Sequence, residues 1–150
     1  MTAHRFMLEA QWPGGRNEVG TISSGQLQTK ISIPKEMDGP GVGTNPDEML
    51  LGAAATCYLI SYAAMLERAK IIPVDLTLSS EGIVDVTNGV FTYEKITHHP
   101  TILLEKNTDE RTQRMVQRLA EKAEKTCMIS KAIRGNVESA LNVTIQIANE

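Results

Sequence analysis

Two cysteines, Cys57 and Cys127, are the side chains of this sequence best suited to covalent chemistry, and the chain has no others. Cys57 lies inside "NPDEMLLGAAATCYLIS" (45–61), which begins like a helix and then becomes apolar on every face. A free cysteine in such a helix is either a small buried hydrophobe or a reactive sulfur held in a dry pocket. This stretch alone leaves both interpretations open.

A reactive Cys57 must be a thiolate, and apolar surroundings disfavour that charge. The helix dipole gives little help, because Cys57 follows the helix start by about eleven residues, or roughly 16 Å at about 1.5 Å per residue, and the dipole acts within the first turn. A cation from elsewhere is therefore needed. Arg16, in the loop "PGGRN" (13–17), is a candidate, and the carboxylates of Asp47 and Glu48 could orient it.

Cys127 follows Thr126 at the predicted junction between a long helix and a short one. The first turn of a helix favours the thiolate and exposes it, so one interpretation is an accessible, reactive thiol. The other interpretation is a second small core residue. The sequence around Cys127 does not decide between them.

The three histidines, His4, His98 and His99, have no metal-ligand spacing with either cysteine. We interpret His98 and His99, at the predicted end of a strand, as solvated residues near a turn. The glycine motifs of phosphate-binding loops, dinucleotide sites and nucleophile elbows are absent. The sequence therefore predicts neither a metal site nor a bound cofactor.

Composition excludes nucleic acid as the main partner. The net charge is −3 with 22% charged residues, and the densest basic run (111–125) is interleaved with glutamate, as in a solvated helix face. Phosphate binding needs a concentrated basic face instead. The 150 residues fit one domain, 1–150, and 41% hydrophobic with 4% aromatic residues predicts an aliphatic core.

The N-terminal residues lack the apolar stretch of a secretory signal, and we expect no window that approaches the ~18 apolar residues of a membrane span. These features predict a cytoplasmic protein without a membrane partner. Reducing conditions in the cytoplasm keep thiols reduced. Any disulfide between the two cysteines is therefore expected to be transient and to form as part of a reaction.

A long helix is predicted from "TNPDE" (44–48) to about Lys70, before Pro73. Thr44 or Asn45 can cap it, the proline suits the first helical position, and the acidic residues favour the positive end of the dipole. The middle of this helix has almost no polar stripe. A sheet covers only one side, so another helix or another subunit must cover the rest.

The order of elements predicts an α+β fold with an antiparallel sheet rather than alternating βαβ units. Asn88-Gly89 indicates a tight hairpin turn, and Thr108 or Asp109 can cap the second helix. The expected elements are strands within 5–33, with a turn at 13–17 and a loop at 34–43; a helix at 44–70; strands at 74–86, 90–99 and 101–106; a helix at 108–125; a short helix at 127–134; and a strand at 137–145.

Three stretches together resemble the OsmC/Ohr family of cysteine-based peroxidases, closer to its organic hydroperoxide resistance (Ohr) branch. They are "GGR" (14–16), "GPGVGTNPDEMLLGAAATCYLIS" (39–61) and "CMISKAIRGNVE" (127–138), so the matches run nearly from end to end. The resemblance implies an OsmC/Ohr-like fold in which antiparallel sheets pack around two central helices of an intertwined homodimer. A second subunit would cover the apolar helix.

The resemblance also implies roles for the site residues. Cys57 matches the peroxidatic cysteine, Cys127 the resolving cysteine, and Arg16 the arginine that holds thiolate and peroxide. Asp47 matches the acid that pairs with this arginine, although the family has glutamate there, and Glu48 is an auxiliary candidate. A second departure is Met128, where the family usually has proline.

The implied activity is a thiol-dependent peroxidase that reduces alkyl or fatty-acid hydroperoxides to alcohols through a sulfenic acid and an internal disulfide. A dithiol, which the resemblance suggests is a lipoyl group on a protein, would then reopen the disulfide. No cofactor is implied. Two alternatives from other classes are a non-catalytic OsmC-like protein that binds a small hydrophobic ligand, and a structural dimer with inert thiols.

Overall fold

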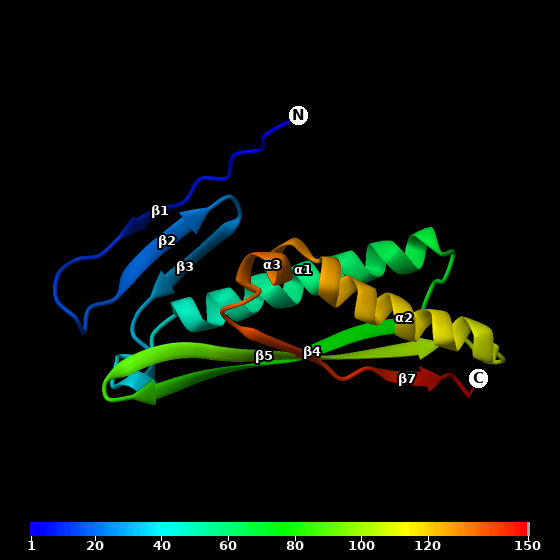
Figure 1. Ribbon diagram of the computed structural model, residues 1–150. Coiled ribbons are helices and arrows are strands. Elements are labelled where there is room, and N and C mark those ends of the chain that lie inside the picture. The colour runs from blue at the N-terminus through cyan, green and yellow to red at the C-terminus, as the bar shows by residue number, and fades with distance from the viewer. Residues whose placement is uncertain (150) are drawn as a thin grey trace. The chain divides into compact units, whose positions relative to one another are not determined.

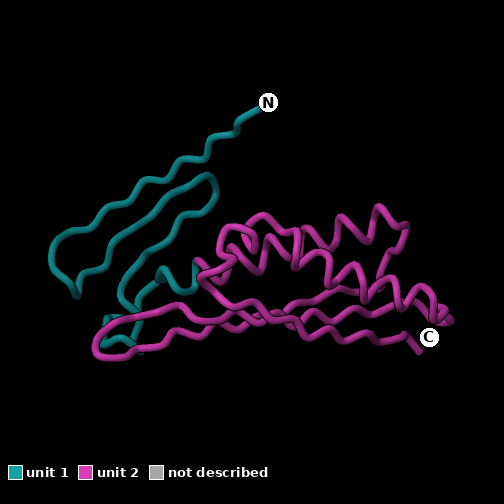
Figure 2. Tube along the Cα trace, viewed as in Figure 1, with its two compact units in different colours: residues 1–49 teal, residues 50–150 magenta. Residues whose placement is uncertain are grey.

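The computed structural model describes residues 1–149, and the chain divides into two compact units, residues 1–49 and 50–150 (Figure 2). The single domain predicted over 1–150 stays a prediction. In chain order (Figure 1), the elements are β1 (Glu9–Gln11), β2 (Gly20–Ser24), β3 (Leu27–Ile31), the 3₁₀ helix η1 (Lys35–Met37), α1 (Pro46–Arg68), β4 (Asp75–Thr87), β5 (Val90–Leu104), α2 (Glu110–Thr126), α3 (Met128–Ile133), β6 (Glu138–Leu141) and β7 (Thr144–Ile147).

The first unit contains a three-stranded antiparallel sheet in the order β1-β2-β3. In β3, Thr29 and Ile31 are half-buried beside exposed Gln28 and Lys30, whereas Leu27 is exposed. The segment predicted as a loop at 34–43 contains the short helix η1.

Helix α1 begins at Pro46, as the sequence predicts. Asn45 is the cap, since its side-chain oxygen accepts a hydrogen bond from the backbone N–H of Glu48 at 2.9 Å. The Thr44 hydroxyl donates to the Glu48 carboxylate, also at 2.9 Å. Both residues suggested as caps therefore stabilise the first turn, which otherwise has unsatisfied N–H groups.

The second unit is built on the long hairpin of β4 and β5. Asn88 and Gly89 form its turn with φ values of 52° and 75°, the left-handed conformation that an Asn-Gly turn favours. The strands predicted at 90–99 and 101–106 are one strand, because β5 continues through Pro100. Its parallel partners pair on either side of this proline, β6 with residues 95–98 and β7 with residues 101–104.

The last strands differ from the prediction of a single strand within an antiparallel sheet. Residues 138–147 contain two strands, β6 and β7, and both pair parallel to β5. A parallel return needs a crossover connection, which α2 and α3 supply. The residue composition of a strand does not indicate whether it pairs parallel or antiparallel. The predicted antiparallel pairing is therefore found only in the β4–β5 hairpin and in the first sheet.

In the second unit, α1 and α2 cover one face of the β4–β5 hairpin (Figure 1). The α2 helix is capped by Asp109, whose carboxylate accepts from the backbone N–H of Thr112 at 2.8 Å. Two buried tyrosines, Tyr58 and Tyr62, lie in the core, so the expectation of an aliphatic core was incomplete. The core cluster consists of Tyr58, Tyr62, Leu66, Ile102, Leu104, Val116, Ala120 and Ala123.

The described elements of the second unit leave one face of α1 exposed, and Ile60 on it is 70% exposed. By length and composition alone, α1 is apolar enough to cross a membrane, so the expectation that no stretch approaches this limit was wrong. Core helices of soluble proteins pass the same test, and α1 supplies four buried residues to the chain. The exposed positions on this face are Gly52, Ala53, Thr56, Ile60 and Ala63.

Candidate active site

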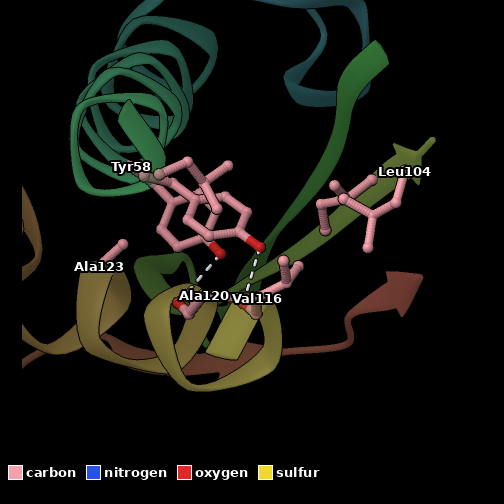
Figure 3. Close-up of a cluster of buried hydrophobic side chains, with 8 residues drawn as sticks. Tyr58, Leu104, Val116, Ala120 and Ala123 are labelled. Atoms are coloured by element: carbon pink, nitrogen blue, oxygen red, sulfur yellow. Dashed lines mark hydrogen bonds between the residues drawn. The ribbon is translucent and has the colours of Figure 1, made fainter. Parts of the chain in front are cut away.

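Two tyrosines fix how α1 lies against α2. Ala54, Tyr58, Tyr62 and Leu66 recur every four residues and form the buried stripe of α1. The Tyr58 hydroxyl donates to the carbonyl of Ala120 at 3.1 Å, and the Tyr62 hydroxyl donates to that of Val116 at 2.8 Å (Figure 3). The pairing runs in opposite directions along the two helices, so α1 and α2 are antiparallel.

Cys57 precedes Tyr58 on α1 and is half-buried at the edge of this stripe. Cys127 ends α2 and begins α3. Its backbone N–H donates to the carbonyl of Ala123 at 2.9 Å, and its own carbonyl accepts from Lys131 at 3.0 Å. The predicted helix junction at Cys127 is therefore confirmed.

The structure brings the two thiols together. Both cysteines are free, and their side chains are close enough for each to shift the pKa of the other. We refer to Cys57 and Cys127 as the sulfur pair. Residues far apart in the sequence thus meet because antiparallel α1 and α2 run alongside each other and α2 ends at Cys127.

The surroundings separate the two thiols chemically. Burial opposes ionisation of Cys57, but hydrogen bonds from Cys127, from the backbone of Ile129 and Met128 and from the Ser61 hydroxyl outweigh it, so the pKa of the Cys57 thiol is lowered. Burial and the hydrogen bond to Cys57 raise the pKa of the Cys127 thiol. The arrangement favours a thiolate at Cys57 and a protonated thiol at Cys127.

Cys127 is 1% exposed, so the interpretation of an accessible thiol with a lowered pKa was wrong. The first turn of α3 acts on the other cysteine instead, because the backbone of Ile129 and Met128 helps to lower the pKa of the Cys57 thiol. N–H groups in the first turn of a helix have no partner within the helix and are available for this purpose.

Sequence reasoning missed Ser61 and Ser130. Ser61 lies four residues after Cys57 on the same helix face, and its hydroxyl helps to lower the pKa of the Cys57 thiol. Ser130 is 4% exposed, and its side chain and backbone oppose the rise in the pKa of the Cys127 thiol. Their four-residue and three-residue spacing from the cysteines is the signal that could have identified them.

Arg16 belongs to the other compact unit and is exposed. Its guanidinium donates to the carbonyl of Met37 at 2.9 Å, to that of Asp38 at 3.3 Å and to the side-chain oxygen of Asn17 at 2.8 Å. These contacts tie the loop at 13–17 to the segment around η1. The contact of Arg16 with Cys57 stays a prediction.

Asp47 and Glu48 both lie in the first turn of α1. The Glu48 carboxylate accepts from Thr44, so this residue has a role in helix capping. Asp47 is half-buried, whereas Glu48 is exposed. Which carboxylate orients Arg16 stays a prediction.

The histidines differ from one another. His4 is exposed, and His99 is exposed as expected, but His98 is 1% exposed, so its interpretation as a solvated turn residue was wrong. It lies within β5 rather than at a strand end, because the strand continues through Pro100. Among residues 1–149, no group of three or more His, Cys, Asp or Glu side chains could hold a metal ion.

An apolar hollow of about 670 Å³ lies at the C-terminal end of α1 in the second unit. Ala63, Leu66, Ile71 and Leu76 are among its lining residues, and Cys57 is not. The hollow is therefore separate from the sulfur pair.

The family model of OsmC-like proteins matches residues 39–142, a span that contains both cysteines. The chain belongs to the OsmC family. This match confirms the family resemblance seen in the sequence.

Individual OsmC relatives match over nearly the whole chain. The uncharacterised protein YmaD of Bacillus subtilis is 57% identical over 150 residues, which cover 100% of both chains. The organic hydroperoxide resistance protein OhrB of the same organism is 30% identical over 92% of this chain and 97% of its own. The crystal structure of an OsmC organic hydroperoxide resistance protein from Legionella pneumophila has a TM-score of 0.76 and 26% identity, and covers 96% of this chain and 99% of that one.

Proposed function

We propose that this protein is a thiol-dependent peroxidase that reduces organic hydroperoxides to alcohols. The observation that carries the proposal is the sulfur pair, in which Cys57 and Cys127 lie together, the pKa of Cys57 is lowered and that of Cys127 is raised. A lowered pKa and partial exposure are the properties of a nucleophilic cysteine. Membership of a family with relatives named for organic hydroperoxide resistance supports the substrate class.

In the first step, the Cys57 thiolate attacks the outer oxygen of the hydroperoxide. An S–O bond forms, the O–O bond breaks, and the alkoxide takes a proton and leaves as the alcohol. Cys57 becomes a sulfenic acid, and the substrate is reduced by two electrons.

In the second step, Cys127 attacks the sulfenic sulfur of Cys57. The S–S bond forms, the S–O bond breaks, and the hydroxyl leaves as water with the proton from Cys127. The order of events follows from the coupling within the sulfur pair. Cys127 retains its proton while Cys57 is a thiolate, and oxidation of Cys57 removes the negative charge that held this proton in place.

In the third step, a dithiol reductant opens the disulfide by thiol–disulfide exchange. It supplies two electrons and two hydrogens and becomes a disulfide itself. A lipoyl group on a partner protein is the proposed reductant.

Arg16 is the proposed ligand of the peroxide, and Asp47, or Glu48 in its place, is the proposed carboxylate that orients it. A guanidinium can donate to thiolate, peroxide and carboxylate at once. The proposed assembly is a cytoplasmic homodimer, supported by the exposed apolar face of α1, which includes Ile60. The partner subunit would also supply apolar surface around the peroxide.

The deciding experiment measures consumption of an alkyl hydroperoxide and of hydrogen peroxide, with dihydrolipoamide as reductant. We expect faster turnover of the alkyl hydroperoxide. A binding protein of the same fold would consume neither peroxide while retaining a hydrophobic ligand, and a protein with inert thiols would show neither activity nor rapid thiol alkylation at neutral pH.

A further inference from the structure

One buried titratable side chain of the second unit has no part in the chemistry above. His98 is 1% exposed in the middle of β5. Its Nδ1 is 2.7 Å from the hydroxyl of Ser80, the residue directly opposite on β4. Its backbone carbonyl accepts from Asn142 at 2.9 Å. The sheet therefore holds both the backbone and the ring of His98.

The ring of His98 is the contact between this sheet and the residue that follows Cys57. It is stacked on Tyr58, with ring centroids 4.9 Å apart and an interplanar angle of 12°. Tyr58 in turn donates to the carbonyl of Ala120 on α2. A continuous line of contacts thus runs from β4 through His98 to α1 and α2, the helices that bring the two cysteines together.

A second contact lies on the α2 side. The carboxylate of Glu124 acts electrostatically on His98, and the Ser139 hydroxyl donates to Glu124 at 2.6 Å. Glu124 precedes Cys127 by about one helical turn. Burial lowers the pKa of His98, Glu124 opposes that shift and neighbouring His99 adds to it. The net effect lowers the pKa of His98, which disfavours a charged ring where it stacks on Tyr58.

We propose that His98 is a positioning residue whose ring, stacked on Tyr58, holds α1 and α2 in the register at which the sulfurs of Cys57 and Cys127 meet. The inference rests on the proposed function, since it concerns the disulfide of that mechanism. A disulfide forms only over a narrow range of Cα separation and dihedral angle. A side chain that fixes the register of the two helices therefore raises the effective concentration of one thiol toward the other.

The experiment measures the equilibrium between dithiol and disulfide in mixtures of reduced and oxidised glutathione, without peroxide. One oxidised glutathione takes two hydrogens from Cys57 and Cys127 and becomes two reduced glutathiones, while the protein gains an S–S bond. The variants are His98→Phe, which keeps a stacking ring, and His98→Gln, which keeps a polar group for Ser80 but loses the ring. His99→Ala, on the adjacent exposed residue, is the matched control.

We expect His98→Gln to lower the effective concentration about ten-fold, which equals about 30 mV for a two-electron couple. His98→Phe and His99→Ala should stay within about two-fold of wild type. A His98→Gln variant with the wild-type equilibrium would overturn the proposal, and so would a fall in His98→Phe as large as that in His98→Gln.

Circular dichroism checks that each variant is folded. If His98→Gln does not fold, Tyr58→Leu removes the stacking partner of His98 together with a hydrogen bond to α2. Tyr62→Leu is its control, because it removes a similar hydrogen bond to α2 and leaves the stack intact. An equal dithiol–disulfide equilibrium in the Tyr58→Leu and Tyr62→Leu variants would also overturn the proposal. If wild type forms no disulfide at any glutathione ratio, the resolving step of the proposed function fails with it, whereas an intact wild-type disulfide with unaffected variants overturns the role of His98 alone.

Discussion

The sulfur pair and the loop that carries Arg16 are held in different ways. Cys127 is 1% exposed at the end of a packed helix, and tyrosine hydroxyls join α1 to α2 beside the pair. Arg16 is exposed and is held by hydrogen bonds to two backbone carbonyls and to its neighbour Asn17. Typical hydrogen bonds contribute only about 0.5–1.5 kcal/mol each, so packed helices hold the sulfur pair, whereas a few weak contacts hold the proposed peroxide ligand.

This contrast teaches that formation of the disulfide should depend on the core of the second unit, whereas capture of the peroxide should depend on the arginine loop. Variants that affect one of these steps and spare the other test the comparison directly.

The largest effect is expected from Cys57→Ser. A serine hydroxyl does not ionise at neutral pH, so turnover of alkyl hydroperoxide should fall below about 3% of wild type. A coupled dithiol-oxidation assay measures it. Turnover near the wild-type rate would remove Cys57 from the mechanism.

Cys127→Ser should separate the two oxidative steps. The first attack on peroxide should remain, but Cys57 can no longer form an internal disulfide and should proceed to sulfinic acid under excess peroxide. Intact mass spectrometry after one and then ten equivalents of alkyl hydroperoxide is the measurement. Wild type should lose two hydrogens and the variant should gain oxygens; oxygens gained by wild type as well would make Cys127 a packing residue.

Arg16→Lys should weaken peroxide capture by about 10-fold or more. A charge-assisted hydrogen bond contributes about 1.5–3 kcal/mol, and an ammonium cannot reproduce the guanidinium fork. Single-turnover rates with alkyl hydroperoxide measure the effect, with Arg5→Lys in the exposed N-terminal segment as control. Wild-type rates would place Arg16 outside the site.

The carboxylate partner of Arg16 can be identified by comparing Asp47→Asn with Glu48→Gln in the same assay. The family register predicts the larger loss, about 10-fold, for Asp47→Asn because a neutral amide no longer offers a charged acceptor. If Asp47→Asn reacts at the wild-type rate and Glu48→Gln reacts more slowly, Glu48 is the carboxylate that orients Arg16.

A smaller effect is expected from Ser61→Ala. The pKa of Cys57 is lowered, so its thiolate is lost as the pH falls through that value, and alkylation of Cys57 should slow at a lower pH than in the unfolded chain. Removing the Ser61 hydroxyl should move the alkylation profile to higher pH and slow the reaction at neutral pH several-fold, as loss of about 1 kcal/mol implies. Peptide-resolved alkylation rates measure it; an unchanged profile would mean that the backbone donors suffice.

The smallest effect is expected from Tyr58→Phe. Removing one hydroxyl that donates to Ala120 should lower the free energy of unfolding by about 1 kcal/mol, or roughly 3 °C in Tm for a chain of this length. Thermal unfolding checks this, and Tyr62→Phe should behave alike. No change in both variants would mean that ring packing alone joins the helices.

Local signals in the sequence predict much of this fold. The cap and the first-position proline of α1, the Asn-Gly turn and the acidic cap of α2 each act within a few residues, so local sequence patterns indicate them directly. The parallel direction of β6 and β7 depends on where a crossover returns the chain, and no local pattern encodes that. Continuation of β5 through Pro100 depends likewise on the change of partner strand.

The candidate site divides in the same way. The helix junction at Cys127 could be predicted because its signals are local, whereas its burial and the stacking of His98 on Tyr58 arise from contacts between distant segments. Sequence reasoning sought a cation to stabilise the Cys57 thiolate. It did not anticipate backbone donors at Met128 and Ile129, since any residue type supplies an N–H.

The shortness of α3 has a consequence for how the site opens. A helix of six residues is too short to be stable without packing, so α3 should undergo local unfolding at much lower free energy than α1 or α2. Amide protons of residues 129–133 should therefore exchange with deuterium well before those of residues 58–66. Such an opening would uncover Cys127 while the tyrosine contacts between the long helices stay closed, so a buried sulfur could become accessible without unfolding of the protein.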